Sequence, residues 1–302
     1  MRAWQFSKPK GPGFGISSNF YLTVLSSKPT LPALLEAIAP GGEHGSVEGF
    51  GVPLGNAGDK SVLAQPMTRG AYALASKDRK TLVKMLILSK EEAGFDPEPF
   101  AMSSLAAESD AELVTRIRST WIVLQLAFET HDPEVYPAVK FMLDLSKRLA
   151  ELTDGVVADS ISRRYLLPEK VFHIPTASDK LDARDVVAIS YRTRPDGIHC
   201  FTLGMQKFAL PEFEIYGVED HSHDLAAVFL LGLCQTALLG KLAEAGAKAG
   251  SSAMPFEIRN GGLDRAMWEG IDCFELLPPT RNTATEALIS WAEESGVVLP
   301  EA

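Results

Sequence analysis

Residues 121–167 constrain the fold more than any other part of this chain. They read as an apolar strand over 121–128, a long amphipathic helix, and a second strand that begins at Val156. Asp132 and Pro133 have the residue types that begin helices. The two strands are predicted to be parallel, either as neighbours joined by a right-handed crossover or with another strand between them.

The predicted helix has an apolar side, with Val135, Ala138, Met142, Leu145, Leu149 and Leu152 at steps of three and four. Its opposite side is predicted to be ion-paired, with Asp144, Lys147, Arg148 and Glu151 at helical spacing.

The first hundred residues are predicted to contain a strand followed by a helix. Residues 19–26 have strand composition, and 31–39 have the pattern of a short helix that Pro40-Gly41-Gly42 ends. Residues 41–58 hold seven glycines, which indicates a twisted hairpin or a long functional loop. We predict a helix within 71–89, although its apolar run also fits a strand.

The second half of the chain is antiparallel in character. A strand over 187–192, a Pro-Asp-Gly turn, and a return strand over 198–203 form a predicted hairpin, to which 210–216 adds a third strand. Residues 224–245 are predicted to be a helix so apolar over its first four turns that it must be covered on several sides. Residues 274–277 look like a late strand.

Two sequences match the capping box that begins helices, Ser109 with Glu112 and Thr283 with Glu286. Together these elements predict an α+β fold: a mixed sheet with a strand-helix-strand core unit, an antiparallel hairpin region, and helices packed on the sheet.

The proline-rich stretch Asp96–Met102 is the best candidate linker. The predicted organisation is a flexible arm at 1–18, an α/β subdomain at 19–100 and an α+β domain at 101–302. The last two are alternatively one continuous domain.

Charge argues against two classes of partner. The chain has 29 basic and 39 acidic residues, a formal charge of −10, which disfavours binding to nucleic acids and to anionic membranes. Its longest uncharged run, 225–240, is shorter than the roughly 20 residues of a membrane-spanning helix. Cys200, Cys234 and Cys273 are far apart and are read as reduced and structural, so the expected location is cytoplasmic.

The densest group of ligand-type side chains is Glu219-Asp220-His221-Ser222-His223-Asp224. His221, His223 and Asp224 could hold a divalent cation at the start of a helix. The plainer interpretation is that Ser222 caps the helix and the acids complement its dipole.

Other candidate residues have equally plain explanations. His131 and Asp132 follow an interior strand, where acid-base groups often lie, but they also fit a helix start. Arg163 and Arg164 could contact a partner's carboxylate, or form an ordinary solvated edge. The spacings typical of phosphate-binding loops, serine hydrolases and nucleophilic cysteines do not occur, and no organic cofactor is expected.

The run TLGMQKFALPEFEI (202–215) and the segment LAELTDGVVAD (149–159) are similar to a bacterial domain family of unknown function. The resemblance covers residues 115–250 and departs from the family at Ala209, where the family tends to have glycine. It implies a compact α+β domain of bacterial origin without assigned activity. Glu212 and Glu214 alternate with apolar residues, so we expect them on one strand face, able to bind a basic partner or a metal ion, or simply solvated.

These patterns favour a non-enzymatic protein that binds another protein, such as an adaptor or immunity-type component. The alternative is a metal-assisted hydrolase that uses His221, His223 and Asp224.

Overall fold

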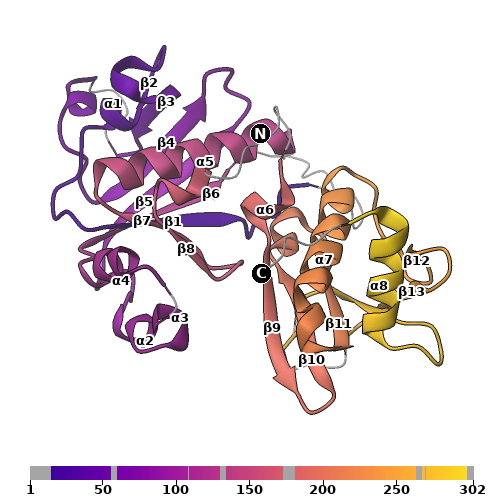
Figure 1. The fold of residues 1–302 in the computed structure, drawn as a ribbon. Coiled ribbons are helices and arrows are strands. Elements are labelled where there is room, and N and C mark those ends of the chain that lie inside the picture. Colours follow the sequence, from indigo (N-terminus) through magenta and orange to yellow (C-terminus); the bar gives the residue numbers. More distant parts are fainter. Residues whose placement is uncertain are drawn as a thin grey trace. The chain divides into compact units, whose positions relative to one another are not determined.

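The computed structural model describes residues 15–55, 60–107, 109–129, 134–172, 181–262, 267–268 and 270–297. The chain forms two compact units, and each has its own sheet (Figure 1). The N-terminal unit is Ser18–Asp185, and the C-terminal unit is Val186–Ala302 together with Met1–Ser17. Parallel and antiparallel strands with packed helices confirm the α+β prediction. Residues 1–14 of the predicted arm lie outside the described residues, and so do His131, Asp132 and Pro133.

The N-terminal unit contains one eight-stranded sheet in the order β2-β3-β4-β5-β6-β1-β7-β8. Its strands are β1 (Tyr21–Ser26), β2 (Ile38–Ala39), β3 (Val47–Pro53), β4 (Gly70–Ser76), β5 (Leu82–Ser89), β6 (Ile122–Phe128), β7 (Val156–Asp159) and β8 (Arg164–Leu166). Its helices are α1 (Leu34–Ala37), α2 (Glu98–Ala101), α3 (Ser104–Ala107), α4 (Ala111–Arg118), α5 (Val135–Leu152) and α6 (Ala183–Val186, which reaches the next unit), with short 3-10 turns η1 (Glu43–Gly45), η2 (Lys60–Ala64) and η3 (Lys170–Phe172).

The predicted strand-helix-strand unit is present, in its split form. Strand β1 pairs antiparallel with both β6 and β7, so these two strands are parallel with β1 between them. Val24 is paired with Leu124 on one side and Val157 on the other, and all three are buried. Leu25 faces the other side of the sheet, in a cluster with Ile117 of α4.

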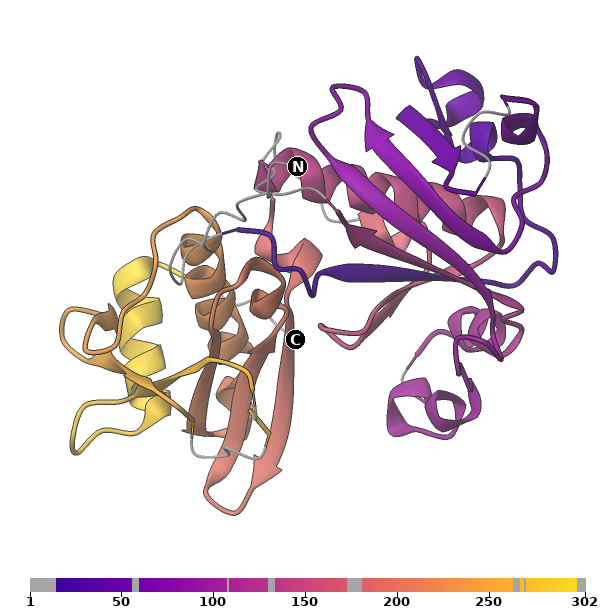
Figure 2. The same ribbon diagram turned by 180° about the vertical axis from the view of Figure 1, so that it is seen from behind.

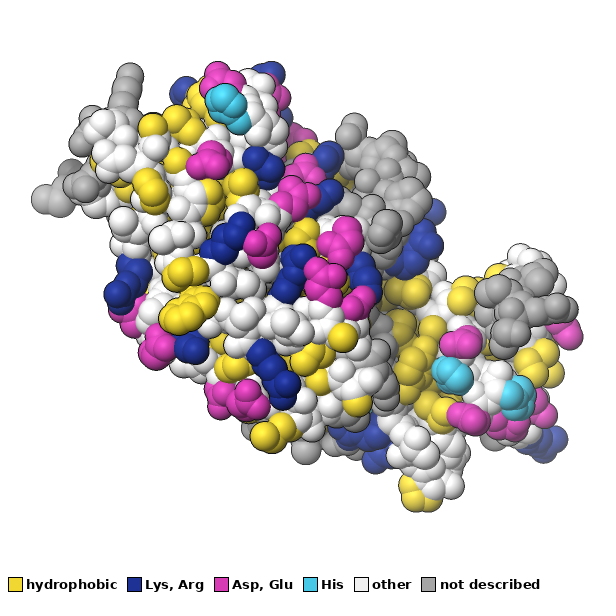
Figure 3. Space-filling model, turned by 60° about the vertical axis from the view of Figure 1, so that its left-hand side comes forward, with side chains coloured by type: hydrophobic (Ala, Val, Ile, Leu, Met, Phe, Trp, Pro, Cys, Tyr) yellow, Lys and Arg dark blue, Asp and Glu magenta, His cyan; other side chains and the backbone are white. Residues whose placement is uncertain are grey.

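The polar side of α5 is ion-paired as predicted. Lys140 pairs with Asp144, while Lys147 and Arg148 both pair with Glu151. Acidic and basic side chains are interspersed over the surface of this unit, without a continuous basic patch on the face that Figure 3 shows.

The predicted helix within 71–89 is wrong, because this segment is the antiparallel hairpin of β4 and β5. Val83, Met85 and Ile87 are buried at every second position, whereas Leu82 and Lys84 are exposed and Leu86 is partly buried. The apolar run concealed this alternation, since the outward-facing side of β5 is also partly apolar.

The candidate linker Asp96–Met102 lies within one unit. Strands β5 and β6, which precede and follow it, are neighbours in the same sheet. The boundary between the compact units falls at Asp185 and Val186 instead of near residue 100. The prolines there begin α2, with Pro97 as its N-cap.

One of the two predicted capping boxes is present. Thr283 and Glu286 exchange hydrogen bonds at the start of α8 (Ala284–Ser295), which Gly296 ends. At α4 the cap is Asp110, whose carboxylate accepts from the Glu112 amide, and not Ser109.

The C-terminal unit contains a six-stranded sheet in the order β12-β13-β14-β11-β10-β9. Its remaining elements are β9 (Ala188–Arg194), β10 (Gly197–Leu203), η4 (Met205–Phe208), β11 (Glu212–Val218), η5 (Asp220–Ser222), α7 (His223–Leu238), β12 (Lys248–Gly250), β13 (Pro255–Asn260) and β14 (Cys273–Leu277). The predicted β9–β10 hairpin, the third strand β11 and the late strand β14 are confirmed.

Helices α7 and α8 lie side by side against one face of this sheet (Figures 1 and 2). Helix α7 ends at Leu238, about two turns before the predicted end at 245, because Gly240 takes a left-handed backbone conformation (φ 84°). Among the described residues, no helix is long and apolar enough to cross a lipid bilayer.

Candidate functional site

Glu212 is a fully buried carboxylate that holds the turn between β10 and β11. Its Oε1 accepts hydrogen bonds from the amides of Gly204 (2.8 Å) and Gln206 (3.3 Å). Its Oε2 accepts from the Thr202 hydroxyl (2.6 Å). Burial raises the pKa of Glu212, while these donors and the charge of the buried Lys207 oppose the rise.

Glu214 is also fully buried, and it is linked to a second polar group. Its Oε2 lies 2.9 Å from Nε2 of His199 and accepts from the Tyr216 hydroxyl (3.1 Å) and the Trp268 indole (2.7 Å). The His199 ring stacks on Tyr216 at 4.0 Å between centroids. Nδ1 of His199 and Oε1 of Glu214 are buried without a hydrogen-bond partner. When Nε2 of His199 carries a proton, it donates to Oε2 of Glu214.

The expectation that Glu212 and Glu214 form an exposed binding strip is therefore wrong. Both carboxylates have no exposed surface, and donors from within the unit reach both oxygens of Glu212 and Oε2 of Glu214. Buried carboxylates of this kind are structural when such donors surround them. The alternation of acidic and apolar residues along β11 could not distinguish an outer face from a buried polar layer.

The same contacts explain the sequence run 202–215. Gly204 has a backbone φ of 136°, and a Cβ there would lie 2.3 Å from the Val186 carbonyl oxygen, so only glycine fits. Ala209 ends η4 with a φ of 54°, the left-handed region that favours glycine. The residue at which the chain departs from the family pattern is thus a strained position.

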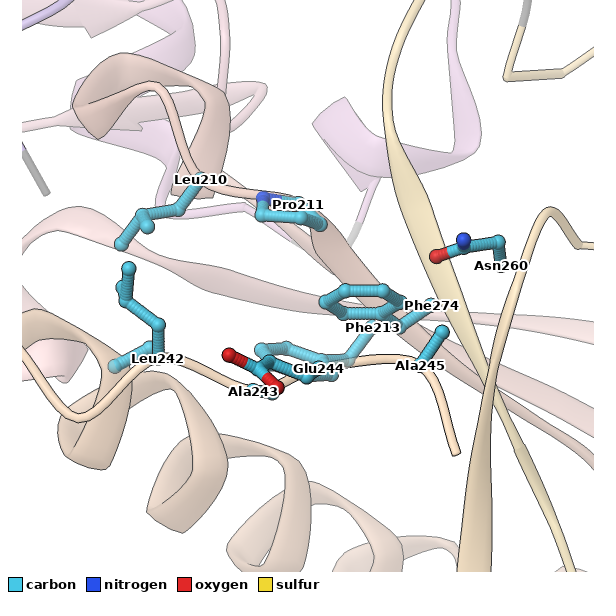
Figure 4. A pocket seen from close by; sticks show the side chains of 10 residues that line it. Leu210, Pro211, Phe213, Leu242, Ala243, Glu244, Ala245, Asn260 and Phe274 are labelled. Atoms are coloured by element: carbon cyan, nitrogen blue, oxygen red, sulfur yellow. The ribbon is translucent and has the colours of Figure 1, made fainter. Parts of the chain in front are cut away.

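Glu212 and its turn position one wall of a pocket. The cavity has a volume of about 280 Å³. Its lining residues are Leu210, Pro211, Phe213, Ala237, Leu242, Ala243, Glu244, Ala245, Asn260 and Phe274 (Figure 4). Phe213 and Phe274, at 5.9 Å between ring centroids, are buried, whereas Leu242, Glu244 and Asn260 are exposed at the rim. This pocket is an apolar cavity with two polar groups at its edge.

The outer side of α7 is a second candidate surface. Residues 225–240 contain no charged side chain. Val228 is 40% exposed and Leu239 is 47% exposed, and Leu231 and Gln235 between them are partly buried. We define Val228, Leu231, Gly232, Gln235 and Leu239, which recur at helical spacing, as the α7 stripe. The prediction that this helix is covered on several sides holds for its inner face only, since the stripe is open to solvent.

Gly232 lies at the centre of the α7 stripe. A glycine within a helix costs about 1 kcal/mol relative to alanine. Such a cost is usually offset where a neighbouring group approaches too closely for a side chain. At Gly232, an added Cβ would meet no atom within 4 Å. Nothing in the described residues therefore requires glycine at this position.

The predicted metal residues form two separate pairs. Nδ1 of His221 lies 3.5 Å from Glu219, and Nε2 of His223 lies 3.3 Å from Asp224. Among the described residues, no group of three or more His, Cys, Asp or Glu side chains is placed to hold a metal ion. The geometry gives the metal hypothesis no support. Ser222 is the N-cap residue of α7, but its hydroxyl makes no capping hydrogen bond.

The two arginines of the predicted basic edge differ. Arg163 is exposed, with a left-handed backbone φ of 54°. The Arg164 guanidinium donates to the carbonyl oxygens of Arg184 (2.8 Å) and Asp185. Arg164 therefore holds the last residues of the N-terminal unit, and it is not a free group for a partner.

The three cysteines are free and buried, as predicted. Burial raises the pKa of Cys200 to about 12, and it also raises the pKa values of Cys234 and Cys273. The thiols stay protonated at neutral pH, so none is activated as a nucleophile.

Comparisons with protein-family models, with curated proteins and with solved structures find no match for this chain. The resemblance of residues 202–215 and 149–159 remains a similarity between short segments.

Proposed function

We propose that this chain acts by binding another protein, and that the α7 stripe is the surface that the partner covers. The observation that carries the proposal is the empty space beside Gly232, a glycine within a helix. No described residue packs into the space that a side chain would fill there. A partner whose backbone or side chains pack closely against α7 would use that space.

The chemistry of the stripe supports the proposal. A helix that is apolar on all sides is normally buried on all sides, and α7 is buried on only one. Completing the burial of Val228 and Leu239 would contribute about 1 kcal/mol each. Because the stripe carries no charge, the partner's contacting surface is expected to be apolar too.

Two substitutions test the stripe. Gly232→Ala adds one methyl group where a partner would approach, and Val228→Glu adds a charge. The matched control is Ile289→Glu on α8, an apolar residue of similar exposure, 41%, outside the stripe. Tagged wild-type and variant chains are purified from the native host, and the bound protein is quantified.

The expected result is a stoichiometric partner with the wild type and with Ile289→Glu. That partner is lost with Val228→Glu and weakened at least tenfold with Gly232→Ala. Retention of the partner by Val228→Glu, or a wild-type chain that sediments alone under all conditions, would contradict the proposal. Sedimentation of the purified chain as a dimer would show that a second copy is the occupant.

A further inference from the structure

We infer that the pocket at the end of α7 binds a small organic amine, a molecule with a compact apolar body and one cationic end. This site is separate from the α7 stripe and does not depend on the protein-binding proposal.

The floor of the pocket selects for an apolar group. Leu210, Phe213, Ala237 and Phe274 are each less than one-tenth exposed, and they present carbon atoms to the cavity. Its volume of about 280 Å³ suits a small ligand with one ring or a branched chain. Water in such a cavity finds few hydrogen-bond partners, so its displacement by a hydrocarbon is favourable.

The rim selects for a positive charge. Glu244 is the charged residue of the lining, and its carboxylate makes no hydrogen bond or ion pair with the described residues. The Asn260 carboxamide also lacks a partner among them, and it lies across the pocket from Glu244 (Figure 4). An ammonium group would donate to the Glu244 carboxylate, whereas a carboxylate or phosphate would be repelled by it.

The wall that carries Glu244 is held by the backbone. Residues 239–247 connect α7 to β12, and the Lys241 amide donates to the Thr236 carbonyl. The Gly246 amide donates to the Ile258 carbonyl of β13 at 2.8 Å. The rim thus has fixed attachments at both ends, which reduces the entropy lost when a ligand binds.

Three ligands with one phenyl ring and different charge test the inference: 2-phenylethylamine, 2-phenylethanol and 3-phenylpropanoate. The full chain, labelled with nitrogen-15, is titrated with each at pH 7.5, and amide shifts are followed for 243–245 and 260. We expect saturable binding of the amine, about three- to fivefold weaker binding of the alcohol, and binding of the acid that is weaker than that of the alcohol by a similar factor.

Two substitutions locate the binding. Glu244→Gln is expected to equalise the affinities of the amine and the alcohol. Ala245→Phe fills the cavity and is expected to abolish both, while Ala247→Phe, two residues along and outside the lining, leaves them unchanged. Gly232→Ala should have no effect, because the α7 stripe is a different surface.

Equal affinity of the wild type for amine and acid would overturn the inference, as would shifts that do not saturate or that survive Ala245→Phe. Loss of partner binding in Val228→Glu with intact amine binding would show that the two sites are independent.

Discussion

The indole nitrogen of Trp268 donates a 2.7 Å hydrogen bond to Oε2 of Glu214, a residue 54 positions earlier in the sequence. Both side chains are buried. The Trp268 ring also meets Phe201 of β10 edge to face, at 5.7 Å between centroids. This contact attaches Trp268 to the sheet face opposite α7.

Trp268→Phe keeps the aromatic contact and removes the donor, which leaves a buried carboxylate with one hydrogen bond fewer. We expect the free energy of unfolding to fall by about 2 kcal/mol, since hydrogen bonds to charged groups contribute roughly 1.5–3 kcal/mol. Urea unfolding followed by circular dichroism measures it. The control, Trp121→Phe, changes a residue that is 57% exposed and should have little effect.

Glu212→Ala leaves three donors without an acceptor in the buried turn: the hydroxyl of Thr202 and the amides of Gly204 and Gln206. The expected loss of stability is about 3–5 kcal/mol. Thermal unfolding tests this, with Glu257→Ala as the control, because Glu257 is exposed and pairs with Arg259 at the surface. A loss no larger than that of the control would mean that the turn does not need the carboxylate.

Ala209→Gly is predicted to stabilise the chain. Alanine at a φ of 54° has a steric cost that glycine lacks, and this exceeds the extra freedom that glycine gives the unfolded chain. We expect a gain of up to about 1 kcal/mol in chemical denaturation. Ala247→Gly, at a position without positive φ, should give no gain.

Asp185 gives stability a pH dependence of unusual sign. Burial, and then repulsion from Asp182, raises the pKa of Asp185 from 3.8 to about 6. Because the pKa of Asp185 is raised in the folded state, its contribution to the free energy of unfolding is fully present below about pH 4. That contribution is lost as the pH rises through 6. We therefore expect Asp185→Asn to be more stable than the wild type at pH 7.5 and no more stable at pH 4.

Asp78→Asn supplies the opposite control for that measurement. The Ser76 hydroxyl and the Lys80 amide lower the pKa of Asp78, so its contribution is present above pH 4 and is lost in acid. If both variants changed in parallel with pH, the assignment to Asp185 would fail.

Elements with a clear period and a clear cap could be predicted from the sequence. The spacing of apolar residues predicted helix α5, and the capping pair Thr283 and Glu286 predicted the start of α8. The β9–β10 hairpin followed from its Pro-Asp-Gly turn. In each case the signal lies within a few residues of the element that it defines.

Features that depend on distant residues could not be predicted. The β4–β5 hairpin was hidden because both faces of β5 carry apolar side chains. Burial of Glu214 depends on Trp268 and His199, which lie far away along the chain. The pocket joins four segments of the chain, and of its lining only Leu210, Pro211 and Phe213 belong to the run 202–215.

The central place of β1 in its sheet has a consequence for the order of folding. Within the sheet, β1 joins the strands β2–β6 to β7–β8, and its neighbour β7 lies more than a hundred residues later in the chain. During translation, the edge of β1 that pairs with β7 therefore stays unpaired until Val156–Asp159 has been synthesised. We expect this long-range pairing to slow the folding of the N-terminal unit.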